Sequence, residues 1–237
     1  IKIIEDGCHS FGSKLSEKNK KIIVGQSKFS SCTTFSFHPV KNITTIEGGA
    51  VTTNDKILYK NLILLRNHGL NRTEINEPYE LFYPSLNFRL GEINAVIGID
   101  QIKRISIFKK KRQKLVNYYL KKIDKYSKFF KPLNFKTNNI FWHLFVIKFN
   151  KNYKHLKKKL MEYLKKNNIQ TQVHYKPLYL HKIYREKIYC NFYKNSFNFY
   201  EQQLTLPLFS KLSNKDLDNI IYKIDKFFNK YKKKNVS

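Results

Sequence analysis

The chain has 237 residues, of which 41% are hydrophobic and 15% aromatic, and it carries a formal net charge of +29. A chain of this length and composition can bury a hydrophobic core, which excludes a disordered tail. No apolar run approaches the roughly 20 residues of a membrane-spanning helix, which excludes a helical membrane protein.

Short apolar segments bounded by turn-forming residues predict three strands in the first part of the chain: Lys2–Glu5, Thr33–Phe37 and Gly49–Thr53. Lys56–Arg66 follows with the spacing of an amphipathic helix. The first part of the chain therefore alternates strands with a helix.

A long polar segment, Asn71–Arg89, contains two prolines and is predicted to be a loop. Loops of this length inside compact domains are usually functional. Gly91–Ile102 is predicted to be a buried helix, and Ile107–Tyr126 a longer, basic one.

The remaining segments continue the alternation of strands and helices. We expect strands at Trp142–Phe149 and Ile169–Val173, and helices at Tyr153–Asn167, Tyr193–Gln203 and Asp216–Lys232. Alternation of this kind is typical of an α/β fold. A change in charge near residue 105 predicts two domains, residues 1–104 and residues 105–237.

The positive charge lies almost entirely in the second of these domains. Residues 1–100 carry 12 Lys+Arg and 10 Asp+Glu, which is +2, and residues 101–237 carry 34 and 7, which is +27. No recognition motif accompanies the lysine blocks, so a solvated basic surface is favoured over a nucleic-acid site. A basic nucleic-acid-binding module stays as an alternative function.

Two further features concern the origin of the chain. Three cysteines, an odd number without a repeated spacing, argue against a disulfide framework and favour the cytoplasm. The chain opens with Ile1 rather than Met, inside an expected core strand. We therefore expect a fragment of a longer protein, whose activity in isolation is doubtful.

Lys41 is the first candidate for chemistry, because it follows an apolar strand and a turn bounded by Pro39. Partial burial at such a position would make its amine available for imine formation. Ser36, five residues earlier, could offer a hydroxyl to an anion near the same turn. A lysine that is only salt-bridged at a strand end is the alternative.

Asp6 ends the first expected strand, where α/β sheets place their ligands. It could cap a helix or face a cofactor. Cys8 and His9 are adjacent, and neighbours on an extended chain point to opposite faces, so they are poorly placed for mutual activation. None of the seven histidines is spaced with another ligand as in a metal site, and we expect no bound metal.

These clusters and the segments after them resemble the DegT/DnrJ/EryC1/StrS family of sugar aminotransferases. The resemblance is carried by Asp6–His9, Ser36–Lys41, Glu47–Val51, Arg66–Gly69, Asn87–Leu90, Ala95–Ile102, Val173–Leu178 and Leu204–Leu208. Within the family, Glu5–Ser10 and Gln172–Pro177 are most similar to the branch that acts in pseudaminic acid synthesis. Phe88 stands where the family often has Tyr, and Ile46 where Gly is common.

The resemblance implies a fold and a set of roles. The fold would be the PLP-dependent aminotransferase fold type I (aspartate aminotransferase-like): the remainder of its large domain, followed by the C-terminal small α/β domain. Lys41 would hold pyridoxal 5′-phosphate (PLP) as an imine and transfer protons. The other implied residues are Asp6 at the pyridine nitrogen, His9 at the ring, Ser36 at the phosphate, Asn87 at a neighbouring subunit's phosphate, and His38, His68, His174 and Tyr175 as weaker substrate contacts.

The implied reaction moves an amino group from an amino acid, with glutamate as the expected donor, to C4 of a UDP-linked 4-keto-6-deoxy-hexosamine. The resemblance also implies a cytoplasmic homodimer with shared active sites and no membrane partner. An inactive, truncated piece of such an enzyme is the alternative to an active one.

Overall fold

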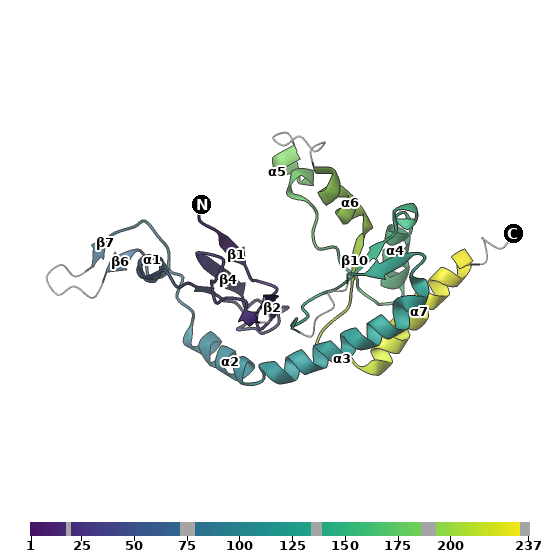
Figure 1. Ribbon diagram of the computed structural model, residues 1–237, viewed down its shortest axis with the longest axis horizontal. Helices are drawn as coiled ribbons and strands as arrows, with labels where there is room; N and C mark the ends of the chain where they lie inside the picture. The colour runs from purple at the N-terminus through teal and green to yellow at the C-terminus, as the bar shows by residue number, and fades with distance from the viewer. Residues whose placement is uncertain (18–19, 72–78, 134–138, 186–192, 233–237) are drawn as a thin grey trace. The chain divides into compact units, whose positions relative to one another are not determined.

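The computed structural model describes residues 1–17, 20–71, 79–133, 139–185 and 193–232 (Figure 1). The chain forms two compact units. The first comprises Ile1–Lys109 and Thr137–His143, and the second comprises Lys110–Lys136 and Leu144–Ser237. The division falls inside one helix, and a short segment returns to the first unit. The predicted boundary between residues 104 and 105 lies at the start of that helix.

The first unit is built on a three-stranded sheet with the order β1 (Ile4–Asp6), β4 (Cys32–Ser36), β5 (Gly49–Thr52). β1 and β4 are parallel, with Asp6 opposite Thr34, whereas β5 is antiparallel to β4. The central strand β4 is the most buried of the three, because it has a partner on each side. Two-stranded ribbons complete the strands of this unit: β2 (Lys14–Glu17) with β3 (Lys20–Ile23), and β6 (Leu70–Asn71) with β7 (Glu80–Leu81).

Two helices accompany this sheet. α1 (Lys56–Arg66) has the predicted bounds, because the side chain of Asp55 accepts hydrogen bonds from the backbone N–H groups of Ile57 and Leu58 and so caps the helix. α2 (Glu92–Lys103) forms where a helix is expected, but Gly98 is its only buried residue. The prediction of a buried helix is therefore wrong for this chain, since Ile93, Val96, Ile99 and Ile102 of α2 are exposed.

The second unit has an antiparallel sheet with the order β10 (Gln203–Leu206), β9 (Phe145–Phe149), β8 (Phe130–Pro132). Its helices are α3 (Ile105–Ile123), which starts in the first unit, α4 (Leu156–Lys166), α5 (Lys182–Arg185), α6 (Lys194–Gln202) and α7 (Asn214–Lys232). The described residues of this unit also form the 3-10 turns η1 (Asp124–Tyr126), η2 (Lys151–Tyr153) and η3 (Leu178–Leu180).

The core of the second unit is aromatic. The ring of Tyr119 on α3 stacks on that of Phe145 on β9, with centroids 4.5 Å apart. α4 buries Leu156, Leu160 and Leu164, which are spaced by four residues along one face. The lysines of α4 mostly lie on the opposite, exposed face. The basic blocks of this helix are therefore a solvated surface around an ordinary core.

Several strand predictions needed correction. Ile169–Val173 is not a strand, because only Gln172 pairs with a neighbour, by a bridge to Thr205. The strand expected at Trp142–Phe149 begins only at Phe145. β2, β3, β8 and β10 were not predicted as strands. Of the predicted loop Asn71–Arg89, residues 72–78 lie outside the described residues, and β7 lies within the rest.

Two absences hold for the described residues only. No helix there is long and apolar enough to cross a membrane. No group of three His, Cys, Asp or Glu side chains there is close enough to hold a metal ion.

Candidate active site

The candidate site begins at the carboxyl edge of the parallel strands β1 and β4. Asp6 is the last residue of β1 and Ser36 the last of β4, so both strands deliver a polar side chain to the same edge of the sheet. The backbone N–H of Gly7 donates to Thr34 O at 2.8 Å and continues the ladder beyond Asp6. This edge is where open α/β sheets bind ligands.

Asp6 is an exposed carboxylate with an electropositive surrounding. Hydrogen bonds from the thiol and the backbone N–H of Cys8 lower the pKa of Asp6, and the positive charges of His9 and Lys41 lower this pKa further, against the opposing effect of burial. The fold thus brings two predicted residues, His9 and Lys41, within electrostatic reach of a third, Asp6. Asp6 is ionised at neutral pH.

Cys8 lies beside this carboxylate and is not activated by it. Burial raises the pKa of the Cys8 thiol, and the hydrogen bond and negative charge of Asp6 raise this pKa further. The thiol is therefore protonated at neutral pH, which is the form that neither attacks carbonyls nor binds metals.

His9 is held by a second histidine that the sequence did not single out. The ring centroids of His9 and His143 lie 4.3 Å apart with an interplanar angle of 53°. His143 is 9% exposed and belongs to the short segment that returns to the first unit. Since 134 positions separate these two residues in sequence, no local spacing could have indicated the contact.

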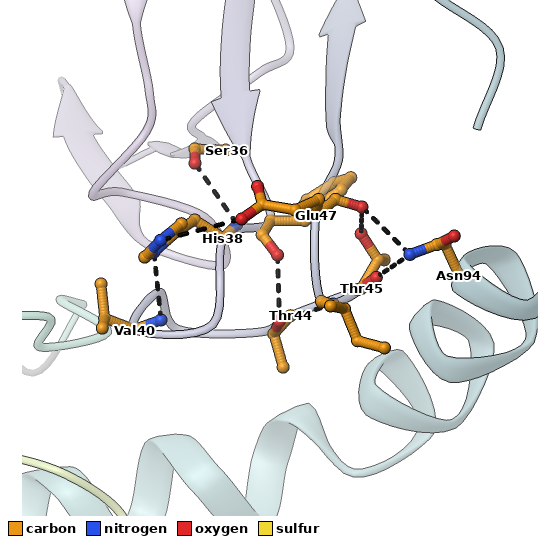
Figure 2. A network of polar contacts seen from close by, with 9 residues as sticks. Ser36, His38, Val40, Thr44, Thr45, Glu47 and Asn94 are labelled. Atoms are coloured by element: carbon orange, nitrogen blue, oxygen red, sulfur yellow. Dashed lines mark hydrogen bonds and ion pairs between the residues drawn. The ribbon is translucent and has the colours of Figure 1, made fainter. Parts of the chain in front are cut away.

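Lys41 lies in the connection between β4 and β5, half-buried, and its backbone N–H donates to His38 O at 2.9 Å. His38 organises this connection: its backbone N–H donates to Ser36 Oγ at 3.4 Å, and its Nδ1 accepts from the N–H of Val40 at 3.4 Å (Figure 2). Nε2 of His38 lies 3.9 Å from Oε1 of Glu47. His38 therefore shapes the turn that carries Lys41.

The base of the same connection is closed by polar contacts with α2 (Figure 2). The side-chain amide of Asn94 on α2 donates to the carbonyl oxygens of Thr45 and Glu47. Thr44 Oγ1 donates to Phe37 O at 3.0 Å and accepts from the N–H of Ile46 at 2.9 Å. α2 is thus tied to the lysine-bearing connection through Asn94.

Glycine is required where this connection enters β5. Gly48 has a φ of +155°, and a Cβ there would clash with Thr45 Oγ1 and with Leu90. A Cβ on Gly49 would lie 2.6 Å from Phe35 O on the neighbouring strand. The Gly-Gly pair therefore allows β5 to pair closely with β4 directly after the turn.

Asn87 and His68 form a separate cluster in the first unit. Asn87 bridges to Asn67, and its Oδ1 accepts the N–H of Arg89 at 3.1 Å. The side chain of Arg89 bonds to Asn67 Oδ1, and the N–H of His68 donates to Leu86 O at 3.1 Å. Asn87 is exposed, and none of these contacts reaches Asp6 or Lys41.

His174 and Tyr175 lie in the second unit. Nδ1 of His174 is 2.8 Å from Thr205 Oγ1, and its backbone N–H donates to Oε1 of the fully buried Gln203 at 3.3 Å. The ring of Tyr175 packs edge-on against that of His174, and Tyr175 is 63% exposed. These contacts fasten His174 to β10 and leave the ring of Tyr175 accessible.

The chain is similar in sequence to known proteins. A model of the DegT/DnrJ/EryC1/StrS aminotransferase family matches residues 1–225. A Helicobacter pylori protein named UDP-4-amino-4,6-dideoxy-N-acetyl-β-L-altrosamine transaminase is 33% identical over 236 residues, which are 98% of this chain and 60% of that protein. A Campylobacter jejuni protein of the same name is 34% identical over 220 residues, covering 91% of this chain and 56% of that protein.

Solved structures show the same likeness. Helicobacter pylori PseC, an aminotransferase involved in the biosynthesis of pseudoaminic acid, aligns with a TM-score of 0.85 and 33% identity, over 96% of this chain and 59% of that one. The PLP-form of a sugar aminotransferase from Streptococcus pneumoniae aligns with a TM-score of 0.85 and 28% identity, over 97% of this chain and 58% of that one. The chain thus spans less than two thirds of the length of these relatives. The fold is fold type I, as the sequence predicts.

Proposed function

Because this chain belongs to the DegT/DnrJ/EryC1/StrS aminotransferase family, we propose that it forms the lysine-bearing part of a PLP-dependent nucleotide-sugar aminotransferase. In this proposal glutamate donates the amino group. The acceptor is C4 of a UDP-linked 4-keto-6-deoxy-hexosamine, the substrate class indicated by the names of the Helicobacter and Campylobacter relatives.

One observation carries the proposal: Asp6 and Ser36 end the parallel strands β1 and β4 at the same edge of the sheet, and the connection that follows Ser36 carries Lys41. Hydrogen bonds from Cys8, and then the charges of His9 and Lys41, lower the pKa of Asp6, so this edge presents an ionised carboxylate and a lysine. PLP chemistry needs this pair, a lysine for the aldehyde carbon and an anion for the pyridine nitrogen.

The other candidate side chains suit the remaining parts of PLP. Ser36 Oγ accepts a hydrogen bond from the N–H of His38, so its own proton is left to donate to a phosphate oxygen. The ring of His9, held by His143, offers a flat face for the pyridine ring. The donor set of this edge therefore fits the cofactor.

Each residue has a distinct task in the proposed reaction. When bound, PLP supplies an electron sink that makes the α-proton of an amino acid acidic. Asp6, as an anion, would stabilise the protonated pyridine nitrogen that this sink needs. Lys41 would hold the cofactor and would move a proton at Cα of the donor and at C4 of the sugar.

We also propose that the active unit is a homodimer that shares residues between two sites. Asn87 is exposed in the first unit and is a candidate for the phosphate of the partner's cofactor. Phe88 beside it is 63% exposed and Leu86 is 67% exposed. Exposed apolar side chains on both sides of a polar residue are typical of a surface that a second subunit covers.

We place the reaction in the cytoplasm. Nucleotide-linked sugars are the proposed substrates, and Cys8 and Cys32 are free thiols, which suits a reducing compartment.

Covalent trapping tests the proposed function. PLP is added to the intact protein, the imine is reduced with borohydride, and the labelled peptide is identified by mass spectrometry. We expect the label on Lys41 and no transfer to a UDP-4-keto-sugar by the Lys41→Arg variant, because Arg keeps the charge and cannot form the imine. Lys60→Arg, on the exposed face of α1, is the matched control and should keep both label and activity. A label on another lysine would reject the assignment.

A further inference from the structure

Asn42 follows Lys41 directly, and it is one of the few buried polar side chains of the first unit, with 7% exposure. Its side-chain amide donates to Phe141 O at 2.8 Å and to Phe11 O at 3.4 Å. Both acceptors are backbone carbonyls of other segments. Asn42 therefore joins three pieces of chain that are remote in sequence: the lysine-bearing connection, the segment after His9, and the returning segment.

The residue that accepts this hydrogen bond through its carbonyl oxygen, Phe141, is itself held in place by other contacts. Phe141 is 0% exposed, and its backbone N–H donates to Oγ of the buried Ser13 at 2.9 Å. The same residue thus receives a hydrogen bond from Asn42 at its carbonyl and gives one to Ser13 at its amide. Two residues before Phe141, the carbonyl of Asn139 accepts a hydrogen bond of 2.8 Å from the N–H of Lys14. The returning segment is therefore anchored to the loop after His9 independently of Asn42.

We propose that Asn42 is a positioning residue for Lys41. The backbone of Lys41 is held from one side by its own hydrogen bond to His38 O, and from the other by the amide of Asn42 on Phe141. Together these bonds fix the orientation in which the lysine leaves the turn. The inference rests on the proposed function in one respect, that the amine of Lys41 is the reacting group.

The buried setting makes this tether effective. The hydrogen bond from Asn42 to Phe141 O is buried, so the turn cannot rotate without leaving this carbonyl oxygen unsatisfied, whereas an exposed bond would exchange with water. Ser13 makes the opposite bond to the same residue, Phe141, but is not attached to Lys41. Ser13→Ala therefore removes a comparable buried hydrogen bond and leaves the tether of the lysine intact.

The experiment compares Asn42→Leu, Asn42→Ser and Ser13→Ala in the intact protein. Asn42→Leu keeps the branched shape of the side chain and removes the amide that donates both hydrogen bonds, and Asn42→Ser, which is smaller, is the second variant if the bulkier leucine variant folds poorly. The first readout is the rate at which a small amine-reactive reagent labels Lys41, measured by peptide mass spectrometry against the exposed Lys60 as an internal reference. The second readout is the rate of borohydride-trapped PLP incorporation at Lys41.

We expect both Asn42 variants to label Lys41 faster, because the half-buried amine is released, and to incorporate PLP more slowly by at least about tenfold, the scale of small misplacements of a reacting group. Ser13→Ala should match the unsubstituted protein in both rates. Equal labelling of Lys41 in all four proteins would overturn the inference, and so would an equal change in Ser13→Ala, since Asn42 would then act only on the anchored segment. If PLP never reaches Lys41 even in the unsubstituted protein, the proposed function fails, and the labelling rates still decide the role of Asn42.

Discussion

The backbone N–H of Cys8 donates a hydrogen bond of 3.0 Å to Oδ1 of Asp6, two residues back along the chain. In this short turn, the hydrogen bonds of Cys8 lower the pKa of the Asp6 carboxyl group, whereas burial, and then the hydrogen bond and charge of Asp6, raise the pKa of the Cys8 thiol. The turn thereby makes Asp6, rather than Cys8, the residue with a charge to offer a ligand.

The first prediction concerns the charge of Asp6. Asp6→Asn keeps an oxygen that accepts the N–H of Cys8, so the turn should persist while the anion is lost. We expect amino-group transfer to fall by about 10²-fold or more, the size of effect typical of a lost charge at a reacting centre. Steady-state rates with the UDP-4-keto-sugar and circular dichroism spectra would measure activity and folding together.

A matched control for this change is Asp55→Asn. Asp55 caps α1 with its side chain, and Asn is as good a cap as Asp, so both stability and activity should stay near the unsubstituted values. If Asp6→Asn and Asp55→Asn lose transfer activity equally, the loss does not depend on the position of Asp6, and its proposed role is rejected.

The second prediction concerns the pH dependence of Cys8. Since burial and the charge of Asp6 raise the pKa of this thiol, the thiolate forms only above the ordinary pH range of a cysteine. Alkylation of Cys8 by iodoacetamide should therefore be slower than that of a model thiol at neutral pH, and should accelerate at a higher pH than the model does. Asp6→Asn should move this acceleration to lower pH. Cys8→Ser should keep the transfer activity, and its loss would contradict the assignment of an inert thiol.

The third prediction tests the shared site. Lys41→Ala and Asn87→Ala should each be inactive alone, because each removes one contribution to every site of a homodimer. Mixed dimers should recover activity, since one of their two sites contains both an intact Lys41 and an intact Asn87. Reassembly of tagged subunits followed by two-step purification would isolate these dimers. Inactive mixed dimers, or a protein that stays monomeric, would reject the shared site.

The fourth prediction concerns the basic second half of the chain. Residues 101–237 carry a net charge of +27, and an extended positive field accelerates the encounter with an anionic diphosphate. The field is screened over about 8 Å at physiological ionic strength, so kcat/KM for the UDP-sugar should fall as salt is added, while kcat changes little. The half-reaction with glutamate, which has no diphosphate, should depend less on salt. If added salt lowers the rates of the UDP-sugar and glutamate half-reactions equally, the lysines have no specific role in capturing the UDP-sugar.

Much of the first unit could be predicted from the sequence, because its signals are local. Asp55 caps the start of α1, and the predicted strand Thr33–Phe37 overlaps β4 (Cys32–Ser36), the central strand of the sheet. Lys41 could be predicted as a candidate for the same reason: a lysine directly after a buried strand and a Pro-bounded turn is unusual. Asp6 could be found from its place at a strand end.

Other features could not be predicted, because they depend on what each segment packs against. The apolar residues of α2 predicted a helix buried against other segments. The sequence could not show that Val96 and Ile99 of this helix are exposed in this chain. Ile169–Val173 has the composition of a strand, yet a strand also needs a continuous partner, and only Gln172 finds one.

The sequence by itself determined the family, the order of most elements, and the candidates Asp6, His9, Ser36 and Lys41, because these follow from residues adjacent along the chain. Only the tertiary structure decided how they are supported. His143 reaches His9, and Phe141 reaches Asn42, across about a hundred residues or more of intervening chain. Contacts at such separations leave no periodic pattern, since their register is set by the packing of the returning segment and not by any local spacing.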